Sequence, residues 1–507
     1  MPVKLKVLFL AAEADPLIKI GGLGDVAGSL PAALLRVSDQ MAQASGQEVR
    51  VEVRLAIPLH GGVDRQRFKF KKAASFRVFH ENGPIPGEAW EANINGVPVY
   101  LIAGWPIRAD ASVYTTDTRV DGFKYAFFSM AALELARTLD WKPDILHAND
   151  WHTAFSIYAL SLRRSRDPFF KNTATLIGMH NLPYLGAGAG AVMNQFGLPS
   201  AINTPLPWWA QNMPLPVGLL TTDQIVAVSP HYALEILTPE FGSGLDGFLR
   251  SRGEAITGIL NGLDTALWDP ANDSALVSPF SPDHLSRRAA NKTALQRELG
   301  LKASHATPLI GLIGRMDHQK GIDLAVQAIR QLANDPQLSS QPWQAVILGT
   351  GDPAIEAEAL RLESDFPRRV RAVLRFDAAL SRRIYGGADM LLIPSRYEPC
   401  GLAQMISMRY GCIPIARATG GLVDTIQDFD ASPDSTGFLF EEAQSAALFV
   451  ALQSALRTYP DRDSWQGLQQ RGMNRDFSWD RSAHAYLDLY LRLVATRQPG
   501  LLQNNSR

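Results

Sequence analysis

The stretch KVLFLAAEADPLIKIGGLGDVAGS, residues 6–29, decides the fold. Its apolar start predicts a buried β-strand, and the polar loop that follows runs into a helix. Lys19 precedes three closely spaced glycines, among them Gly21 and Gly22, and Asp25 stands where an acid favours the positive end of the helix dipole. Glycine loses the most backbone freedom on folding, so these glycines need a reason other than stability.

The strand–loop–helix pattern repeats along the chain. In the first half the apolar runs are KVLFLAA, VRVEVRLAIP, VPVYLIA, DILHAN, TATLIGM and DQIVAVS; after residue 300 they are PLIGLIG, QAVILGT, VRAVLRF, ADMLLIP, GCIPIAR and GFLF. Helical patterns lie between them, as at 124–139 and 321–333. Such alternation is typical of parallel sheets covered on both faces. We therefore expect an α/β fold with two doubly wound, Rossmann-like domains facing an interdomain cleft, with ligands beyond the strands' carboxyl ends.

The length of 507 residues exceeds what one hydrophobic core normally supports. We expect one domain over 1–252, a second over 253–480, and a closing helix and tail over 481–507 that pack back toward the first domain. A Gly-, Ala- and Pro-rich stretch, 186–218, predicts a mobile excursion from the first domain.

Composition excludes several classes of protein. The net charge of −1 gives no general basic field for nucleic acid or an acidic membrane, and no apolar stretch is long enough to span a bilayer. Two cysteines provide no disulfide framework. GGLGDVAG has one spacer too many for a dinucleotide-binding fingerprint, which argues against an NAD dehydrogenase. We expect a cytoplasmic protein, or a protein of the plastid stroma if a transit peptide was removed, and the oligomeric state stays open.

The loop GLIGRMDHQKG, residues 311–321, follows a strand of the second half. It places Arg315 and Lys320 beside the start of a helix, where a guanidinium and an ammonium suit a diphosphate. A pair of solvated surface cations is the equally open alternative.

The loop PSRYEPCGLAQM, residues 394–405, follows another strand and contains Glu398. Gly401 opens a helix whose free N–H groups could bind a phosphate or a sugar hydroxyl. The alternative for Glu398 is a capping or surface carboxylate. Cys400 has no histidine nearby in sequence, so we interpret it as a small buried residue rather than a nucleophile.

Two loops of the first half, ILHANDWHTA and IGMHNLPYLG, carry a cluster of polar residues: His147, Asp150, His152, His180 and Asn181. A zinc site is one interpretation, but the compact spacing of zinc ligands is missing. Recognition of sugar hydroxyls fits better, with Trp151 and Tyr184 available to stack on sugar rings. Isolated core histidines remain the third possibility.

Taken in order, the motifs KIGGLGDV, HANDWH, HNLPYLG, VSPHYALEILTPEFGSGLDGFL, GILNGLD, GRMDHQKG, EPCGL and RATGGLVDT resemble those of bacterial glycogen synthases and plant starch synthases, glycosyltransferase family 5. The resemblance runs from about residue 5 to 480. It implies the GT-B fold, with an acceptor-side domain followed by a nucleotide-sugar domain. It also implies transfer of glucose from ADP-glucose to the non-reducing end of an α-1,4-glucan with retention of configuration, and no metal or other cofactor.

The resemblance also implies roles for the residues around the donor diphosphate. Lys19 would lie near the donor phosphates and the transferred glucose, and Gly21 and Gly22 would bring backbone amides close to the diphosphate. Arg315 and Lys320 would neutralise the departing ADP.

Around the sugar, the resemblance implies that Glu398 holds glucose hydroxyls rather than attacking carbon. His180 would contact the sugar and stabilise developing positive charge through its backbone carbonyl. Asp150 would stand on the acceptor side.

The remaining implied contacts belong to the nucleotide. Leu402 and Ala403 would offer N–H groups to the distal phosphate. Gly420 and Gly421 would shape a donor-side turn. Phe376 would stack on adenine where the family commonly has tyrosine.

Three residues depart from the family pattern: Ala403 replaces threonine, Lys124 replaces arginine and Pro183 replaces alanine. These departures put rate and donor preference in doubt, not the reaction class. UDP-glucose as donor is one alternative. A catalytically inactive glucan-binding or regulatory homologue is another, although the intact Glu398, Arg315 and Lys320 count against it.

Overall fold

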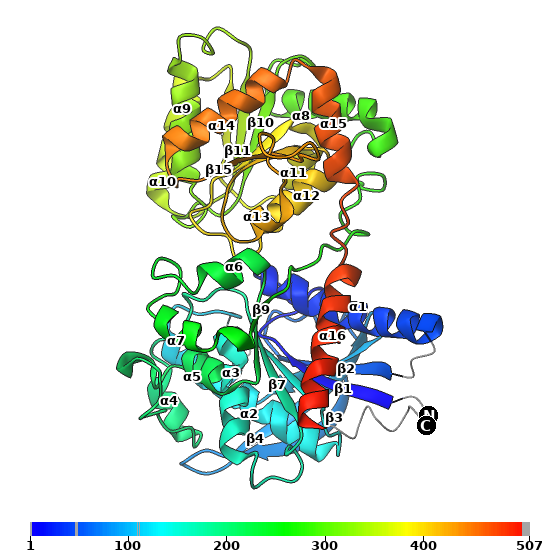
Figure 1. Ribbon diagram of the computed structural model, residues 1–507, viewed down its shortest axis with the longest axis vertical. Helices are drawn as coiled ribbons and strands as arrows, with labels where there is room; N and C mark the ends of the chain where they lie inside the picture. Colours follow the sequence, from blue (N-terminus) through cyan, green and yellow to red (C-terminus); the bar gives the residue numbers. More distant parts are fainter. Residues whose placement is uncertain (1–2, 46–48, 109, 111, 499–507) are drawn as a thin grey trace. The chain divides into compact units, whose positions relative to one another are not determined.

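The computed structural model describes residues 3–45, 49–108, 110 and 112–498, and the chain forms two compact units (Figure 1). The first unit takes the chain as far as Gly262 and again from Trp479 onward. The second unit is the segment between them, Leu263–Ser478. Each unit has one sheet of its own.

The first unit contains a nine-stranded sheet in the order β3-β4-β5-β2-β1-β6-β7-β8-β9. Its strands are β1 (Val3–Leu10), β2 (Val49–Pro58), β3 (Lys71–Val78), β4 (Ile85–Ile94), β5 (Val97–Ala103), β6 (Ile145–Asn149), β7 (Ala174–Met179), β8 (Gln224–Ala227) and β9 (Ile256–Gly258). Its helices are α1 (Gly22–Ser45), α2 (Thr118–Thr138), α3 (Asp150–Arg163), α4 (Gly190–Gln195), α5 (Pro214–Thr221), α6 (Pro230–Glu235), α7 (Asp246–Ser251) and α16 (Trp479–Arg497).

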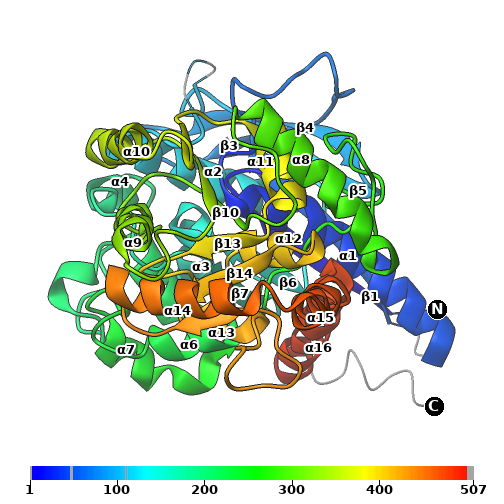
Figure 2. The same ribbon diagram turned by 90° about the horizontal axis from the view of Figure 1, so that it is seen from above.

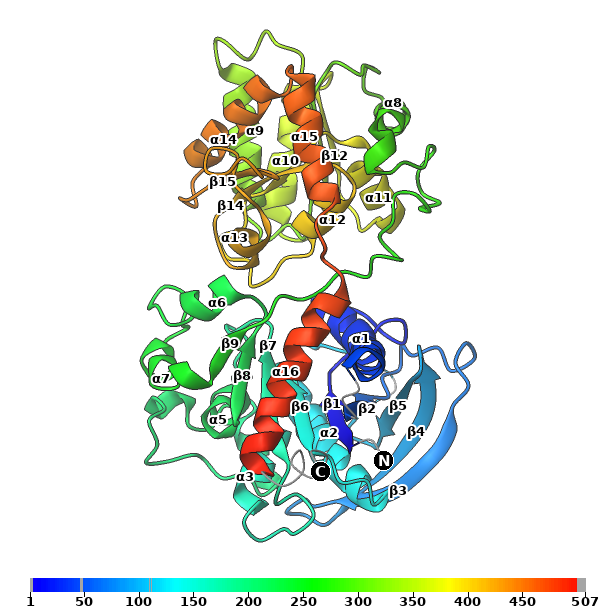
Figure 3. The same ribbon diagram turned by 45° about the vertical axis from the view of Figure 1, so that its right-hand side comes forward.

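The order in which the chain adds strands to the first sheet reverses between the central strands, β1 and β6. From β1 the chain passes through α1 to β2 on one side, and from β6 it passes through α3 to β7 on the other. Right-handed crossovers therefore put α1 and α3 on opposite faces. Helix α16 packs against α1 (Figure 3), whereas α2 and α5 pack against α3. The carboxyl ends of β1 and β6 form a topological switch point, where ligands bind in open α/β sheets.

The second unit contains a six-stranded parallel sheet in the order β12-β11-β10-β13-β14-β15. Its strands are β10 (Leu309–Ile313), β11 (Gln344–Leu348), β12 (Val370–Val373), β13 (Met390–Ile393), β14 (Ile413–Arg417) and β15 (Phe438–Phe440). Its helices are α8 (Arg288–Glu298), α9 (Ile322–Asn334), α10 (Pro353–Asp365), α11 (Ala378–Gly387), α12 (Ala403–Arg409), α13 (Gly421–Thr425), α14 (Ser445–Thr458) and α15 (Arg462–Met473).

The second sheet has the same kind of reversal, between β10 and β13. Helix α9 leads from β10 to β11, and α12 leads from β13 to β14 in the opposite direction. Helices α9, α10 and α14 pack together, as do α8 with α11 and α12 with α15 (Figure 2). The amphipathic α9 shows why: Ile322, Ala325, Ile329 and Leu332 form its buried stripe on the sheet.

All twelve strands expected from apolar runs are present, six in each sheet. The other three strands lie in the first unit. β3 and β4 form an antiparallel hairpin at the sheet edge, and β3 is largely exposed, so it shows no continuous apolar run. β9 pairs with β8 and extends the first unit past the predicted boundary at 252/253.

Two further expectations concern segments of the first unit. The expectation of an excursion at 186–218 is wrong for its C-terminal part. Leu215 and Val217 of α5 are fully buried against the rest of the first unit, because the apolar run there is long enough to make a core helix. The closing helix α16 does belong to the first unit, and it begins at Trp479.

Candidate active site

In the second unit, the loops after β10 and β13 are joined by an ion pair at the switch point. Lys320 Nζ lies 2.6 Å from Glu398 Oε2, and the Ser395 hydroxyl donates to the same oxygen at 2.8 Å. The Lys320 side chain keeps 27% of its surface exposed, against 10% for Glu398. The carboxylate is therefore fixed from within, whereas the ammonium is reachable from solvent.

Backbone contact holds these two loops together beside the ion pair. Gly321 has a left-handed φ of 64°, and a Cβ there would stand 2.1 Å from the carbonyl oxygen of Pro394. Arg396 N–H donates to the carbonyl of Gln319 at 2.8 Å. Only glycine permits this approach at the start of α9.

Arg315 lies in the same loop as Lys320, as the sequence predicted. Its guanidinium contacts Asp317 at 2.8 Å and donates to Gln319 Oε1 at 3.3 Å. The side chain is 63% exposed, so its charge is available to an incoming anion.

Gly420 and Gly421 lie against the loop that carries Glu398. A Cβ on Gly420 would come within 2.1 Å of the Glu398 carbonyl oxygen, and one on Gly421 within 2.1 Å of the Cys400 carbonyl oxygen. Gly421 N–H also donates to the Glu398 carbonyl at 3.1 Å. These glycines therefore support the backbone of Glu398. Cys400 is buried and so lacks the exposure of a reactive thiol.

The predicted nucleotide contacts lie on two further loops of the second unit. Phe376, between β12 and α11, is 87% exposed, so its ring is accessible from solvent. Leu402 is the N-cap residue of α12, whose first residue is Ala403. N–H groups at this position have no partner within the helix.

In the first unit, the loop after β1 is organised by a residue that the sequence analysis did not select, Glu13. Its carboxylate accepts hydrogen bonds from the N–H groups of Ile20 and Gly21, the latter at 3.1 Å, and from the Tyr114 hydroxyl at 3.0 Å. Burial raises its pKa, and these bonds oppose that shift. An acid directly after an apolar strand was the available signal. The Gly21 amide thus has a protein partner here, and its contact with a diphosphate stays a prediction.

The glycines of the same loop fall into two kinds. A Cβ on Gly28 would stand 2.3 Å from the Asp15 carbonyl oxygen, and one on Gly24 would lie 3.0 Å from Lys19 Cγ. Packing therefore explains both of these glycines. A Cβ on Gly22 would meet nothing within 4 Å, so packing gives no reason for glycine at this position.

Lys19 lies in the loop just before α1, and its ammonium is 2.6 Å from the Asp25 carboxylate. The lysine side chain is 39% exposed. Asp25 is thus the partner of Lys19 as well as an acid in the first helical turn.

The end of β6, the start of α3 and the loop after β7 meet beside the first unit's switch point. Asp150 Oδ1 accepts from His180 N–H at 2.7 Å, and His180 Nε2 lies 2.8 Å from Asn149 Oδ1. Asp150 adopts a positive φ of 53°, a strained backbone for a residue other than glycine. Burial raises the pKa of Asp150, and the nearby His180 opposes the shift.

Of the other polar and aromatic residues in these two sequence motifs, His147, His152 and Trp151 are core residues. His147 and His152 are buried, and burial holds the pKa of each well below its usual value. The predicted stacking role of Trp151 is wrong, because Trp151 is 6% exposed and packs on His152 with ring centroids 4.3 Å apart. Tyr184 is 55% exposed. Within the described residues, no group of three or more His, Cys, Asp or Glu side chains could hold a metal ion.

Lys124, one of the departures from the family pattern, is also a core residue. Its ammonium donates to the Val113 carbonyl at 2.7 Å and to Asp121 at 2.8 Å, and the side chain is 1% exposed. The lysine therefore fastens the loop before α2 rather than meeting solvent.

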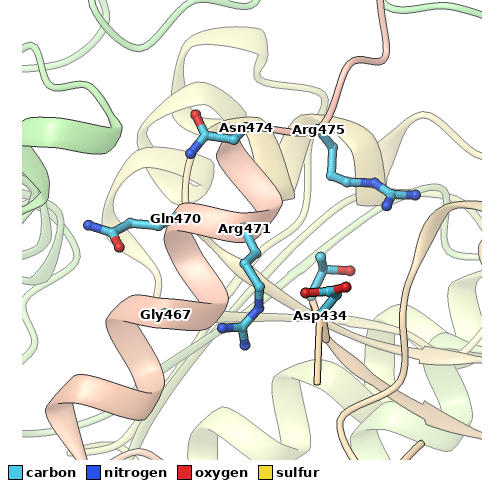
Figure 4. Close-up of a pocket in the computed structure, with 7 residues that line it drawn as sticks. Asp434, Gly467, Gln470, Arg471, Asn474 and Arg475 are labelled. Carbon is cyan, nitrogen blue, oxygen red and sulfur yellow. The ribbon is translucent and has the colours of Figure 1, made fainter. Parts of the chain in front are cut away.

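The second unit also has a hollow of about 480 Å³ (Figure 4), and no predicted site residue lines it. Its lining residues are Asp434, Thr436, Gly467, Gln470, Arg471, Asn474 and Arg475. Arg471 is already bound to the Ser435 carbonyl at 2.7 Å.

In the described part of the chain, no helix is long and apolar enough to cross a membrane.

Comparison with known proteins places this geometry in a family. The family described as starch synthase catalytic domain matches residues 6–251, and glycosyl transferases group 1 matches residues 300–467. A glycogen synthase of Anaeromyxobacter dehalogenans is 40% identical over 97% of this chain and 100% of its own length. A glycogen synthase of Thermotoga maritima is 39% identical over 97% of this chain and 99% of its own length.

The solved structures agree. The catalytic domain of starch synthase IV from Arabidopsis thaliana, bound to ADP and acarbose, superposes with a TM-score of 0.82 at 32% identity, covering 97% of this chain and 99% of that one. A sucrose-phosphate synthase from Thermosynechococcus elongatus shares the fold, with a TM-score of 0.58 at 20% identity over 97% and 100% of the two chains. The predicted GT-B fold class is confirmed. The chain belongs to the family of bacterial glycogen synthases and plant starch synthases, which are glucosyltransferases.

Proposed function

We propose that the protein is a retaining glucosyltransferase that moves glucose from ADP-glucose to the non-reducing end of an α-1,4-glucan. The observation that carries the assignment of a sugar-diphosphate donor is the Lys320–Glu398 pair at the second unit's switch point, with Arg315 exposed in the same loop. The ADP in the starch synthase IV structure, a protein 32% identical to this one, supports the choice of nucleotide.

The chemistry asks for cations at the leaving group. When the bond between glucose and the diphosphate breaks, negative charge grows on ADP, and groups already aimed at that charge lower the barrier. Lys320 and Arg315 are the cations for this task. Lys320 Nζ lies 2.6 Å from Glu398 Oε2. The ammonium can exchange this carboxylate for a phosphate, while Glu398 accepts hydrogen bonds from glucose hydroxyls.

The first unit supplies the groups proposed for the sugar and the acceptor. Gly22 leaves space where a side chain would otherwise stand, which suits close approach of a diphosphate to the backbone. Lys19 adds a partly exposed cation. The His180 carbonyl faces the developing positive charge on the sugar, and Asp150, fixed by His180 N–H, takes the acceptor side.

The nucleotide contacts complete the proposal. Phe376 presents an exposed ring for adenine. The N–H groups of Leu402 and Ala403 bind the distal phosphate without the threonine hydroxyl common in the family. Gly420 and Gly421 keep the Glu398 loop in place. Neither a metal nor another cofactor is assigned a step, and the cytoplasmic location expected from the sequence belongs to this proposal.

Measurement of ADP release tests the proposal. The purified protein is given ADP-glucose with and without maltooligosaccharide, and released ADP and extended oligosaccharide are measured together. We expect ADP release that depends on the acceptor and matches chain extension. Equal or faster turnover with UDP-glucose would overturn the donor assignment. Binding of glycogen without release of either nucleotide would identify an inactive glucan-binding homologue.

A further inference from the structure

Asn149 stands at the N-cap of α3, yet its side chain does not cap the helix. Asparagine at this position normally accepts a hydrogen bond from the first turn. Here the backbone of Asn149 is instead paired with the Thr153 hydroxyl, which accepts from Asn149 N–H and donates to the Asn149 carbonyl at 2.8 Å. The side-chain amide of Asn149, which is 1% exposed, is therefore available for hydrogen bonds to groups outside α3.

The orientation of that amide follows from its neighbours. One end lies 2.9 Å from the carbonyl oxygen of Leu10, the last residue of β1. A carbonyl oxygen only accepts, so the amide must present its NH₂ group there. Its oxygen consequently points the other way, 2.8 Å from His180 Nε2.

We propose that Asn149 is a positioning residue that holds His180 as the Nε2–H tautomer, leaving Nδ1 as a hydrogen-bond acceptor for a hydroxyl of the transferred sugar. The tautomer follows because an amide oxygen can only accept, so Nε2 must carry the hydrogen. Nδ1 makes no hydrogen bond to any residue that the structure describes, and the His180 side chain is partly exposed.

The surroundings of His180 keep its ring neutral. Three titratable groups interact electrostatically with the His180 ring: Asp150, His147 and His152. Burial lowers the pKa of His180, and Asp150 opposes that shift. A neutral ring has one N–H and one lone pair, so fixing the hydrogen on Nε2 also fixes what Nδ1 can bind.

Gly178 shows how closely this arrangement is packed. A Cβ there would stand 2.7 Å from Asn149 Oδ1 and 3.4 Å from His180 Nε2. A side chain at this position would push the amide off the imidazole. The sequence HN at 180–181 attracts attention to the histidine, whereas its partner, Asn149, is the last residue of β6.

The assignment of a sugar hydroxyl to Nδ1 rests on the proposed function, but the tautomer does not. Long-range ¹H–¹⁵N spectra of histidine-labelled protein distinguish the two tautomers directly. The chain has 10 histidines, so the His180 signals are identified by their loss in His180→Gln. We expect the Nε2–H pattern in the wild-type protein. An Nδ1–H pattern would overturn the proposal, whatever the enzyme activity.

Asn149→Leu removes both hydrogen-bonding groups of the amide. We expect His180 to populate both tautomers and kcat/KM for the donor to fall by about 2- to 10-fold, the worth of one neutral hydrogen bond. Tyr490→Phe is the matched control, because the Tyr490 hydroxyl lies 2.6 Å from His147 Nδ1 and touches neither Asn149 nor His180. It should move the His147 signals and leave the His180 tautomer unchanged.

Asn149→Asp separates positioning from a merely structural role and serves if Asn149→Leu fails to fold. A carboxylate still accepts from Nε2–H, but its charge raises the pKa of His180, and a charged ring has no lone pair on Nδ1. We expect kcat/KM to be reduced at low pH and to recover as the pH rises. A flat pH profile with the wild-type tautomer would contradict the role of Nδ1. If the wild-type protein shows the Nε2–H pattern but no transferase activity, the proposed function is refuted and the tautomer assignment stands.

Discussion

The two units place their candidate residues at the same point of the same topology but hold them by different forces. In the first unit the link across the switch point is a buried neutral amide, Asn149, between the Leu10 carbonyl and His180. In the second it is the Lys320–Glu398 ion pair, with the lysine 27% exposed. Burial makes charge expensive, so the deeper link is neutral and the shallower one is ionic.

The difference separates groups that must stay from groups that must move. A neutral buried amide keeps its partners because breaking it leaves unpaired polar atoms. A partly exposed ammonium can exchange a carboxylate for a phosphate at little cost, because water and the ligand both compensate it. Each prediction below compares one unit with the other.

The largest expected effect is on the stability of the second unit. In Gly321→Ala the new methyl would meet the Pro394 carbonyl at 2.1 Å with φ at 64°. Backbone strain and overpacking together should lower the free energy of unfolding by about 2–6 kcal/mol. Gly314→Ala in the same loop is the control, since its nearest neighbour would be 3.9 Å away. Equal melting temperatures for the two variants, measured by calorimetry, would contradict the packing argument.

Acid should unfold the first unit before the second. Burial lowers the pKa of His60 to about 4. The contribution of the neutral His60 ring to the free energy of unfolding is therefore fully present above pH 6.5, the ordinary pKa, and is lost as the pH falls from 6.5 toward 4. This one group is worth about 3 kcal/mol. His147 and His152 act in the same direction, and Glu13 and Asp150, whose pKa values are raised, offset part of it.

Hydrogen exchange followed by mass spectrometry distinguishes the two units under acid. The histidines of the second unit are exposed, so they give it no comparable penalty. Peptides of the first unit should lose protection at the higher pH. Loss in the reverse order would contradict the assignment of buried neutral histidines to the first unit.

Lys320→Ala should lower kcat/KM by about 10- to 150-fold, the loss of one charge-assisted contact to the diphosphate. Lys302→Ala, which removes an exposed lysine of the same unit, is the control. Steady-state kinetics with ADP-glucose and maltooligosaccharide measure both variants. Unchanged kinetics in folded Lys320→Ala would remove Lys320 from the diphosphate site.

The smallest effect compares a buried neutral hydrogen bond with an exposed ion pair. Tyr490→Phe leaves His147 Nδ1 without its partner at 2.6 Å and should cost about 1 kcal/mol. Arg330→Ala breaks the pair with Asp365 in the second unit, whose side chains are 40% and 49% exposed, and should cost less than about 0.5 kcal/mol. Denaturant unfolding gives both values, and a larger loss for Arg330→Ala would reverse the ranking.

Apolar periodicity was enough to predict the two α/β units, because buried parallel strands are continuously apolar. It missed β3, whose residues are mostly exposed or half-buried, and β4, in which exposed and half-buried residues interrupt the buried ones. It also missed the short β9. The family resemblance brought Lys320 and Glu398 to attention, but their 2.6 Å pairing depends on strand order, which the sequence does not display.

The first unit's site was less predictable than the second's. Trp151 and His152 have the composition of a sugar-binding loop, yet both are core residues, because α3 turns them inward. Glu13 was overlooked although an acid directly after an apolar strand was a signal, and its Gly21 partner is a backbone group. Asn149 was overlooked because its Leu10 partner is a backbone group, which leaves no sequence signal.

The two crossings of the chain between units have a practical consequence. In the first unit, Gly262 packs so closely on Trp479 that a Cβ would lie 2.5 Å from the Trp479 Cα. In the second unit, the next residues along the two crossings, Leu263 and Ser478, form a β-bridge. The second unit is thus an insertion whose two ends emerge together. Excision of 263–478 as a separate gene, with Gly262 fused to Trp479, should yield two independently expressible proteins.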